Sequence, residues 1–209
     1  MDPDRGQSPL YGAGARALQD RFDSRRLADR LSEVTVTDAL SERDREMIAR
    51  QSALWLGTVD AAGWPDVSYK GGAPGFVVCP DDTTVEVPVY DGNGMFRSTG
   101  NIVDTGRAAL LFTDPGRGWR LRIHGTASVS VDEADLAGRV GAIGVIVVRL
   151  SRAFPNCGRY LHPGGEIGDD TPRDGHTPPL ADWKRWSVVR DALPVDDLAR
   201  LADESPEDR

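Results

Sequence analysis

Cysteine, histidine and long apolar runs are scarce in this chain, and each scarcity excludes a class of protein. Two cysteines, Cys79 and Cys157, cannot build a disulfide scaffold and favour a reducing compartment. The three histidines have no spacing, with each other or with Cys157, that is typical of a metal site. No run is long enough to span a bilayer, and residues 1–14 lack the apolar core of a signal peptide. We therefore expect a cytoplasmic protein with no membrane segment and no metal.

Basic residues are also fewer than acidic residues. The 209 residues include 25 Lys and Arg against 33 Asp and Glu, a formal net charge of −8. Nucleic acids and anionic membranes attract cations, so this balance argues against either partner, although a local basic site can still hold a phosphate. With 28% charged and 39% hydrophobic residues, the composition is that of an ordinary globular protein, and the length favours one domain with extra terminal elements.

What the sequence does contain is a series of short β-like runs, dense between residues 54 and 125 and separated by Gly, Pro and Asp turns. This pattern predicts a mainly antiparallel barrel of about six strands, and neither a helical bundle nor a parallel sheet. Expected strands cover residues 54–59, 65–69, 76–79, 83–89, 107–113, 119–131 and 145–154, with 76–79 and 83–89 forming a hairpin.

Two helices are expected to precede the barrel. Apolar residues spaced four apart predict one helix over residues 13–31, and Ser41 is a good N-cap for a second that buries Met47 and Ile48. Further helices are predicted at residues 95–104, 132–140 and 195–202. The expected division is a mobile N-terminus (1–12), a helical lead-in (13–50), the barrel (51–162), and a loop and C-terminal tail (163–209), with a poorly packed loop at 164–179.

Basic residues recur at turns and at a helix start within this acidic chain. Arg97 and Ser98 open the helix predicted after a Gly-rich turn, where free backbone N–H groups bind phosphate readily. Lys70 ends a strand before two glycines, and Arg120 shares a strand face with Arg122. Taken alone, Arg97 and Arg120 are more typical of ordinary solvent-exposed positions, and Lys70 is equally compatible with an exposed strand end. Together they suggest a site for a small anionic ligand.

Three segments carry a resemblance to a known family: VSYKGGAPGF (67–76), YDGNGMFRS (90–98) and FPNCGRY (154–160). Together with the helical segment 17–30, they are similar to the pyridoxamine 5′-phosphate oxidase-like superfamily of FMN-binding split β-barrels, in a bacterial subgroup of oxidase-related flavoproteins. The resemblance covers residues 13–162. It implies a mainly β (α+β) fold, an antiparallel FMN-binding split barrel with N-terminal helices and a C-terminal extension.

The resemblance also implies how the cofactor is held. Arg97 stands where the family grips the FMN phosphate, while Ser98 replaces a lysine of that motif. Lys70 corresponds to the lysine that closes the flavin-lining strand, and Arg120 takes the place of a glutamine that touches the ring, where its charge would favour the reduced flavin. The expected cofactor-binding residues are Ser68, Tyr69, Lys70, Arg97, Ser98 and Arg120. No catalytic residue is identified.

The implied function is an FMN-dependent oxidoreductase that acts on an unknown small molecule, as a homodimer with FMN at the subunit interface. The oxidases carry an Arg-x-His substrate motif near their C-terminus, which the tail of this chain lacks, so a pyridoxal phosphate site is not supported. Two alternatives remain open: a non-catalytic flavin carrier or sensor, and a split barrel that uses F420 or haem.

Overall fold

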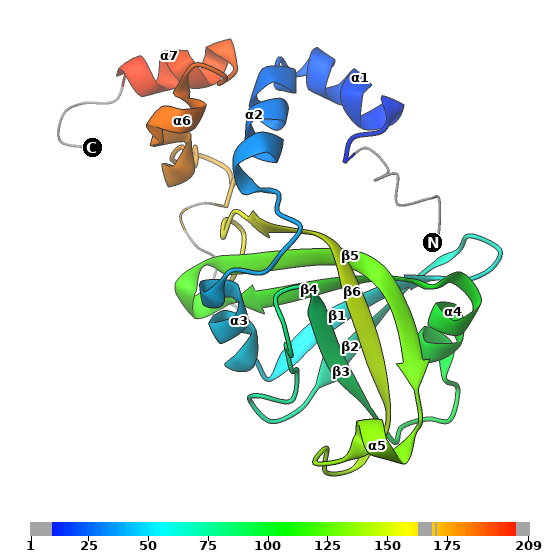
Figure 1. Cartoon of the computed structure of the whole chain (residues 1–209). Helices are drawn as coiled ribbons and strands as arrows, with labels where there is room; N and C mark the ends of the chain where they lie inside the picture. Colours follow the sequence, from blue (N-terminus) through cyan, green and yellow to red (C-terminus); the bar gives the residue numbers. More distant parts are fainter. Residues whose placement is uncertain (1–9, 163–168, 170, 204–209) are drawn as a thin grey trace. The chain divides into compact units, whose positions relative to one another are not determined.

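The computed structural model describes residues 10–162, 169 and 171–203, and these fall into two compact units (Figure 1). The barrel unit spans Thr37–Asn156. The helical unit combines residues from the two ends of the chain, within Met1–Val36 and Cys157–Arg209. Each unit has an apolar cluster of its own, so each can be understood by itself.

The barrel unit is built on one six-stranded sheet with the order β2-β1-β4-β5-β6-β3, in which every neighbouring pair is antiparallel. The sheet curls around its core, and the edge strands β2 and β3 do not pair with each other, which makes a split barrel (Figure 1). The strands are β1 (Ala53–Val59), β2 (Pro65–Gly71), β3 (Thr84–Tyr90), β4 (Arg107–Asp114), β5 (Trp119–Ser130) and β6 (Ala142–Asn156).

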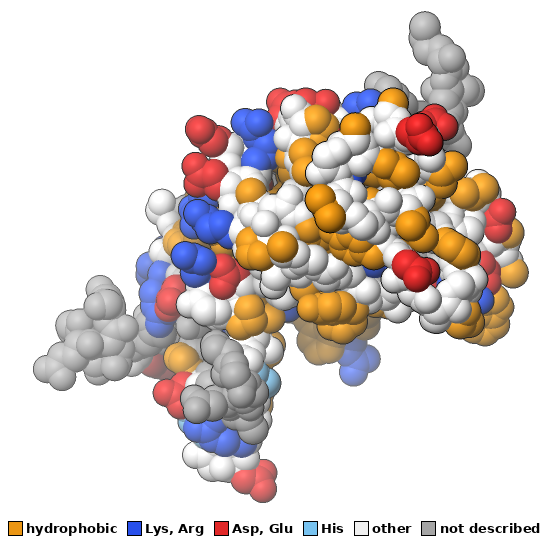
Figure 2. All heavy atoms as spheres, turned by 90° about the horizontal axis from the view of Figure 1, so that it is seen from below, with side chains coloured by type: hydrophobic (Ala, Val, Ile, Leu, Met, Phe, Trp, Pro, Cys, Tyr) orange, Lys and Arg blue, Asp and Glu red, His pale blue; other side chains and the backbone are white. Residues whose placement is uncertain are grey.

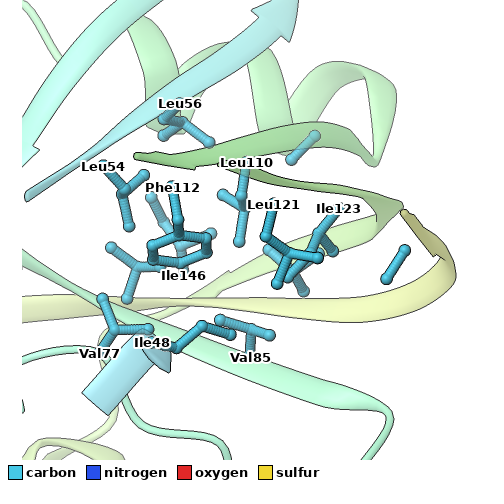
Figure 3. Close-up of a cluster of buried hydrophobic side chains, with 14 of the residues drawn as sticks. Ile48, Leu54, Leu56, Val77, Val85, Leu110, Phe112, Leu121, Ile123 and Ile146 are labelled. Atoms are coloured by element: carbon cyan, nitrogen blue, oxygen red, sulfur yellow. The ribbon is translucent and has the colours of Figure 1, made fainter. Parts of the chain in front are cut away.

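Alternation along the strands creates the core. Leu54 and Leu56 of β1, and Leu110 and Phe112 of β4, point to the inner face and are at most 1% exposed. Figure 3 shows these side chains packed against those of Leu121, Ile123 and Ile146 from the strands that follow, with Ile48 from a helix. The inner face of the sheet is therefore the buried side. The strand residues that alternate with these buried ones form the outer face.

Three helices accompany the strands. At the start of α3 (Glu42–Ala49), the Ser41 hydroxyl accepts a hydrogen bond from the Asp44 N–H, and the Ser41 N–H donates to the Asp44 carboxylate. This reciprocal capping box stabilises the start of the helix. The others are α4 (Arg97–Thr105) and the one-turn α5 (Glu133–Leu136), with a 3₁₀ turn, η1, at Pro115–Arg117. In Figure 2, seen from the side of α5, hydrophobic side chains gather with few charges between them; Val131 and Val140, which flank α5, are exposed.

The helical unit contains α1 (Ala13–Arg21), α2 (Arg25–Thr35), η3 (Asp182–Arg185), α6 (Ser187–Arg190) and α7 (Val195–Asp203). Its core joins Leu27 of α2 to Leu180, Val189, Leu193 and Leu201. At the surface of this unit, Arg30 donates to the Asp191 carboxylate at 2.9 Å. Among the described residues, no helix has the length and apolar character needed to cross a membrane.

The predicted antiparallel split barrel with leading helices is confirmed, but three local predictions were wrong. The helix expected over residues 13–31 is two helices, because Asp23 adopts a left-handed conformation (φ 48°) that ends α1 before α2 begins. Residues 76–79 form no strand, and the expected hairpin is reduced to one antiparallel bridge between Val78 and Glu86. The helix expected at 132–140 ends at Leu136. Of the loop expected at 164–179, residues 164–168 and 170 lie outside the described residues, as do residues 1–9 of the expected mobile N-terminus.

Candidate functional site

The start of α4 and the middle of β2 meet through two side chains that the sequence analysis singled out. The hydroxyl oxygens of Ser68 and Ser98 lie 2.9 Å apart and share a hydrogen bond, although 30 residues separate them. One turn further along α4, Asn101 Nδ2 donates to Thr58 Oγ1 of β1 at 3.1 Å, and both residues are buried. These two bonds hold the N-terminal half of α4 against β1 and β2.

The first turn of α4 offers unused hydrogen-bond donors. The first bond of the helix runs from the Gly100 N–H to the Phe96 carbonyl at 2.7 Å, and within the described chain the N–H groups of Arg97, Ser98 and Thr99 have no acceptor. Phe96 precedes the helix in a left-handed conformation (φ 49°), a strained arrangement for a residue with a side chain. The positive end of the helix dipole therefore lies at the start of α4, beside the buried Ser98.

Two cations in this region, Arg97 and Lys70, form no ion pair with any carboxylate of the described residues. Arg97 is exposed, and no acidic group of the described residues lies within ion-pair distance of it. Lys70 is half-buried two residues from Ser68, on the same face of β2. Burial lowers the pKa of Lys70, and the Asp66 carboxylate offsets only part of that shift. An anion bound beside Lys70 would raise this pKa again and so favour the charged form of the amine.

Tyr69 and Arg120 lie on the other side of the sheet. Tyr69 is next to Ser68 in a strand, so its ring points to the outer face, where it contacts Trp55 edge-on with centroids 5.4 Å apart. Arg120 pairs in register with Thr113 of β4 and Asn156 of β6, also on the outer face. The structure thus brings together Ser68 and Ser98, with Arg97 next to Ser98 and Lys70 two residues from Ser68 on the same strand face. It does not bring Tyr69 or Arg120 to that group.

Two features of the site were missed in the sequence. The bond between Asn101 and Thr58 joins residues 43 positions apart, and no local pattern announces such a contact. The left-handed Phe96 was also missed, although the Gly-rich turn before it indicated an irregular backbone. His124 on β5 is half-buried, and burial, with Arg152 and Arg122 nearby, lowers its pKa and so favours the neutral imidazole. No group of three or more potential metal ligands occurs in the parts of the chain that the structure covers.

Comparison with known proteins identifies the lineage of this barrel. Residues 40–150 match the family model described as pyridoxamine 5′-phosphate oxidase. No curated protein matches the sequence. Among solved structures, the chain is similar to HupZ of Group A Streptococcus, at 26% identity and a TM-score of 0.45, covering 56% of this chain and 93% of HupZ.

Two further solved structures are similar over the same part of the chain. HutZ, the haem storage protein of Vibrio cholerae, is 20% identical with a TM-score of 0.38, covering 56% of this chain and 90% of HutZ. A Clostridium acetobutylicum protein related to general stress protein 26 is 12% identical with a TM-score of 0.43, covering 57% and 88%. Because the family model spans more than half of its residues, this chain belongs to the pyridoxamine 5′-phosphate oxidase-like family.

Proposed function

We propose that the protein binds FMN and acts as an FMN-dependent oxidoreductase on a small molecule. The observation that carries the proposal is the Ser68–Ser98 contact, which fixes the donor-rich start of α4 beside β2. Both serines belong to segments whose family counterparts hold FMN. A helix start with free N–H groups, an adjacent arginine and a half-buried lysine is chemically suited to a phosphate dianion.

In this proposal, each residue of the site contributes hydrogen bonds or positive charge to phosphate binding. The N–H groups of the first turn and the Ser98 hydroxyl supply hydrogen bonds, while Arg97 supplies a bidentate cation from the solvent side. Lys70 supplies charge from the barrel side. Since Ser98 stands where the family motif has lysine, Arg97 and Lys70 carry the whole positive charge of this group. When FMN is bound it supplies the redox chemistry, and the protein supplies orientation and local charge.

The proposal includes a homodimer, because within one barrel unit two of the expected cofactor-binding residues lie on the face of the sheet opposite to Ser68. Tyr69 and Arg120 lie on the outer face and cannot join Ser68 on the inner face within one sheet. In a dimer they would contribute to the site of the partner subunit. Met95 and Phe96, directly before Arg97, are 63% and 57% exposed, and a second subunit would cover such apolar side chains.

The visible spectrum of the purified protein, followed by mass measurement of the released ligand, tests the proposal. A flavin spectrum with the mass of FMN is the expected result. A deazaflavin band would assign F420 instead, and a Soret band would assign haem, the ligand named for HutZ of Vibrio cholerae. A flavin that stays oxidised with nicotinamide cofactors and candidate amines would make the protein a flavin carrier.

Assembly is tested on the same material. Dilution of the dimer to a monomer, followed by analytical ultracentrifugation at the flavin wavelength, should release the cofactor. A monomer that retains FMN with unchanged affinity would contradict the shared site.

A further inference from the structure

We propose that Asn93 is a site of spontaneous covalent modification, at which the side-chain amide leaves as ammonia and a carboxylate takes its place. Asn93 is exposed and lies in the irregular segment between the end of β3 and the start of α4, and the next residue is Gly94. The backbone nitrogen that follows an asparagine can attack the side-chain carbonyl carbon when the two are held close together. Two features of this turn favour that attack.

The first feature is access to the attacking nitrogen. Gly94 has no Cβ to shield its backbone nitrogen, its φ is 72°, and a Cβ built there would meet no atom within 4 Å beyond its chain neighbours. No acceptor among the described residues occupies the Gly94 N–H. Residues 91–96 belong to no helix or strand, so no ladder of backbone hydrogen bonds must break for the turn to reach the reactive geometry.

The second feature is a donor placed at the oxygen on which charge develops. The Met95 N–H donates to Asn93 Oδ1 at 3.0 Å. When the Gly94 nitrogen attacks Cγ, negative charge accumulates on this oxygen, and a donor that is already in place stabilises it as an oxyanion hole does. The same bond folds the side chain back over the turn, as in an Asx-turn, and so keeps Cγ beside the next backbone nitrogen.

The reaction needs no reagent except water. The bond between the Gly94 nitrogen and Asn93 Cγ forms, the bond from Cγ to Nδ2 breaks, and the proton of the attacking nitrogen leaves with the ammonia. Water then opens the cyclic imide at either of its carbonyl groups, which gives aspartate or isoaspartate at this position. Nothing is oxidised or reduced. Because the Gly94 nitrogen must lose its proton to attack, the rate should rise with pH.

The other candidate positions are protected or less reactive. Asn101 is buried in α4, where its Nδ2 donates to Thr58, and Asn156 lies in β6 with its Oδ1 buried. Asp91 also precedes a glycine, but its Oδ1 accepts from the Gly92 N–H at 3.0 Å, and a carboxylate is a much poorer target for a nucleophile than an amide. Asn101 and Asn156 therefore serve as controls within the same chain.

The product adds a negative charge four positions before Arg97, at the helix start. This charge would repel a phosphate bound there and would offer Arg97 a competing partner. Modified protein should therefore bind FMN a few-fold more weakly at low salt. This consequence rests on the proposed function, whereas the modification itself does not.

The experiment incubates the purified full-length protein in mildly alkaline buffer and follows the peptide that contains Asn93 by mass spectrometry. We expect this peptide to gain the mass difference between amide and acid at least as fast in the folded protein as in protein unfolded in urea. The peptides that contain Asn101 and Asn156 should stay unchanged in the folded protein. Asn93→Gln, whose longer side chain forms the imide far more slowly, should stop the change. Asn93→Asp reproduces one product and should show the weaker FMN binding without incubation.

Three results would overturn the inference: an unmodified peptide, a wild-type rate in Asn93→Gln, or a rate in the folded protein far below that of the unfolded chain, since the turn would then protect Asn93. If the spectrum showed no flavin while Asn93 still lost its amide, the proposed function would fail and the modification site would stand. If Asn93→Asp bound FMN as tightly as the wild type, the predicted effect on the cofactor would be refuted.

Discussion

Replacing Arg97 with alanine tests the phosphate site at its most accessible point. Arg97 is exposed at the first position of α4, and its side chain forms no hydrogen bond or ion pair with any other described residue, so its removal should leave the fold intact. Its contribution is then confined to the ligand. A charge-assisted hydrogen bond contributes about 1.5–3 kcal/mol, which corresponds to a loss of FMN affinity of roughly tenfold to 150-fold.

The assay compares two ligands in apo-protein by quenching of flavin fluorescence. FMN carries the phosphate and riboflavin does not, so Arg97→Ala should weaken FMN by the calculated factor and leave riboflavin almost unchanged. The difference should shrink as salt is raised, because the arginine is at the surface and screened. Arg107→Ala, another exposed arginine at the start of a strand of the same unit, is the control. Equal losses for both ligands would show that Arg97 supports the fold and would refute the phosphate assignment.

Three further predictions follow from neighbouring residues. Because the pKa of Lys70 is lowered, the apo-protein should lose the charge of Lys70 as the pH rises through a value below the usual 10.5, and FMN affinity should fall over the same range. In Lys70→Met this fall should disappear. If the variant kept the pH profile of the wild type, Lys70 would have no role in FMN binding. Asn101→Ala leaves the buried Thr58 hydroxyl without its partner, and should lower the free energy of unfolding by about 1–3 kcal/mol in urea titrations. Arg120→Ala should retain FMN but slow its reduction in stopped-flow measurements; normal reduction would remove the role assigned to Arg120.

Local chemistry made part of the fold predictable. Ser41, followed by acidic residues and then by Met47 and Ile48, carries a cap and a buried face within eight residues, and α3 forms as expected. The helix break at Asp23 was missed because it depends on one left-handed residue between two segments that share the same apolar spacing. Residues 76–79 have the composition of a strand, yet only Val78 finds a partner, because strand formation depends on what lies beside the segment.

The candidate site shows the same limit at longer range. The position of Arg97 at a helix start could be inferred from the Gly-rich turn and from the family motif, and the structure agrees. The contact between Ser68 and Ser98 could not be inferred from the sequence, since it depends on how α4 packs against the edge of the sheet. The opposite orientations of Ser68 and Tyr69 follow from strand alternation, which the sequence analysis did not apply when it placed both residues in one cofactor site.

The helical unit draws its core from both ends of the chain, and this sets the order in which the protein can fold during synthesis. Leu27 of α2 leaves the ribosome early, but Leu180, Val189, Leu193 and Leu201, which bury it, are made only after the entire barrel unit. The barrel residues Thr37–Asn156 are contiguous and can collapse in the meantime. Throughout that interval the residues that bury the apolar stripe of α2 have not yet been made. A nascent chain stalled before α6 would therefore contain a complete barrel sequence and an N-terminal helix whose apolar stripe lacks these partners.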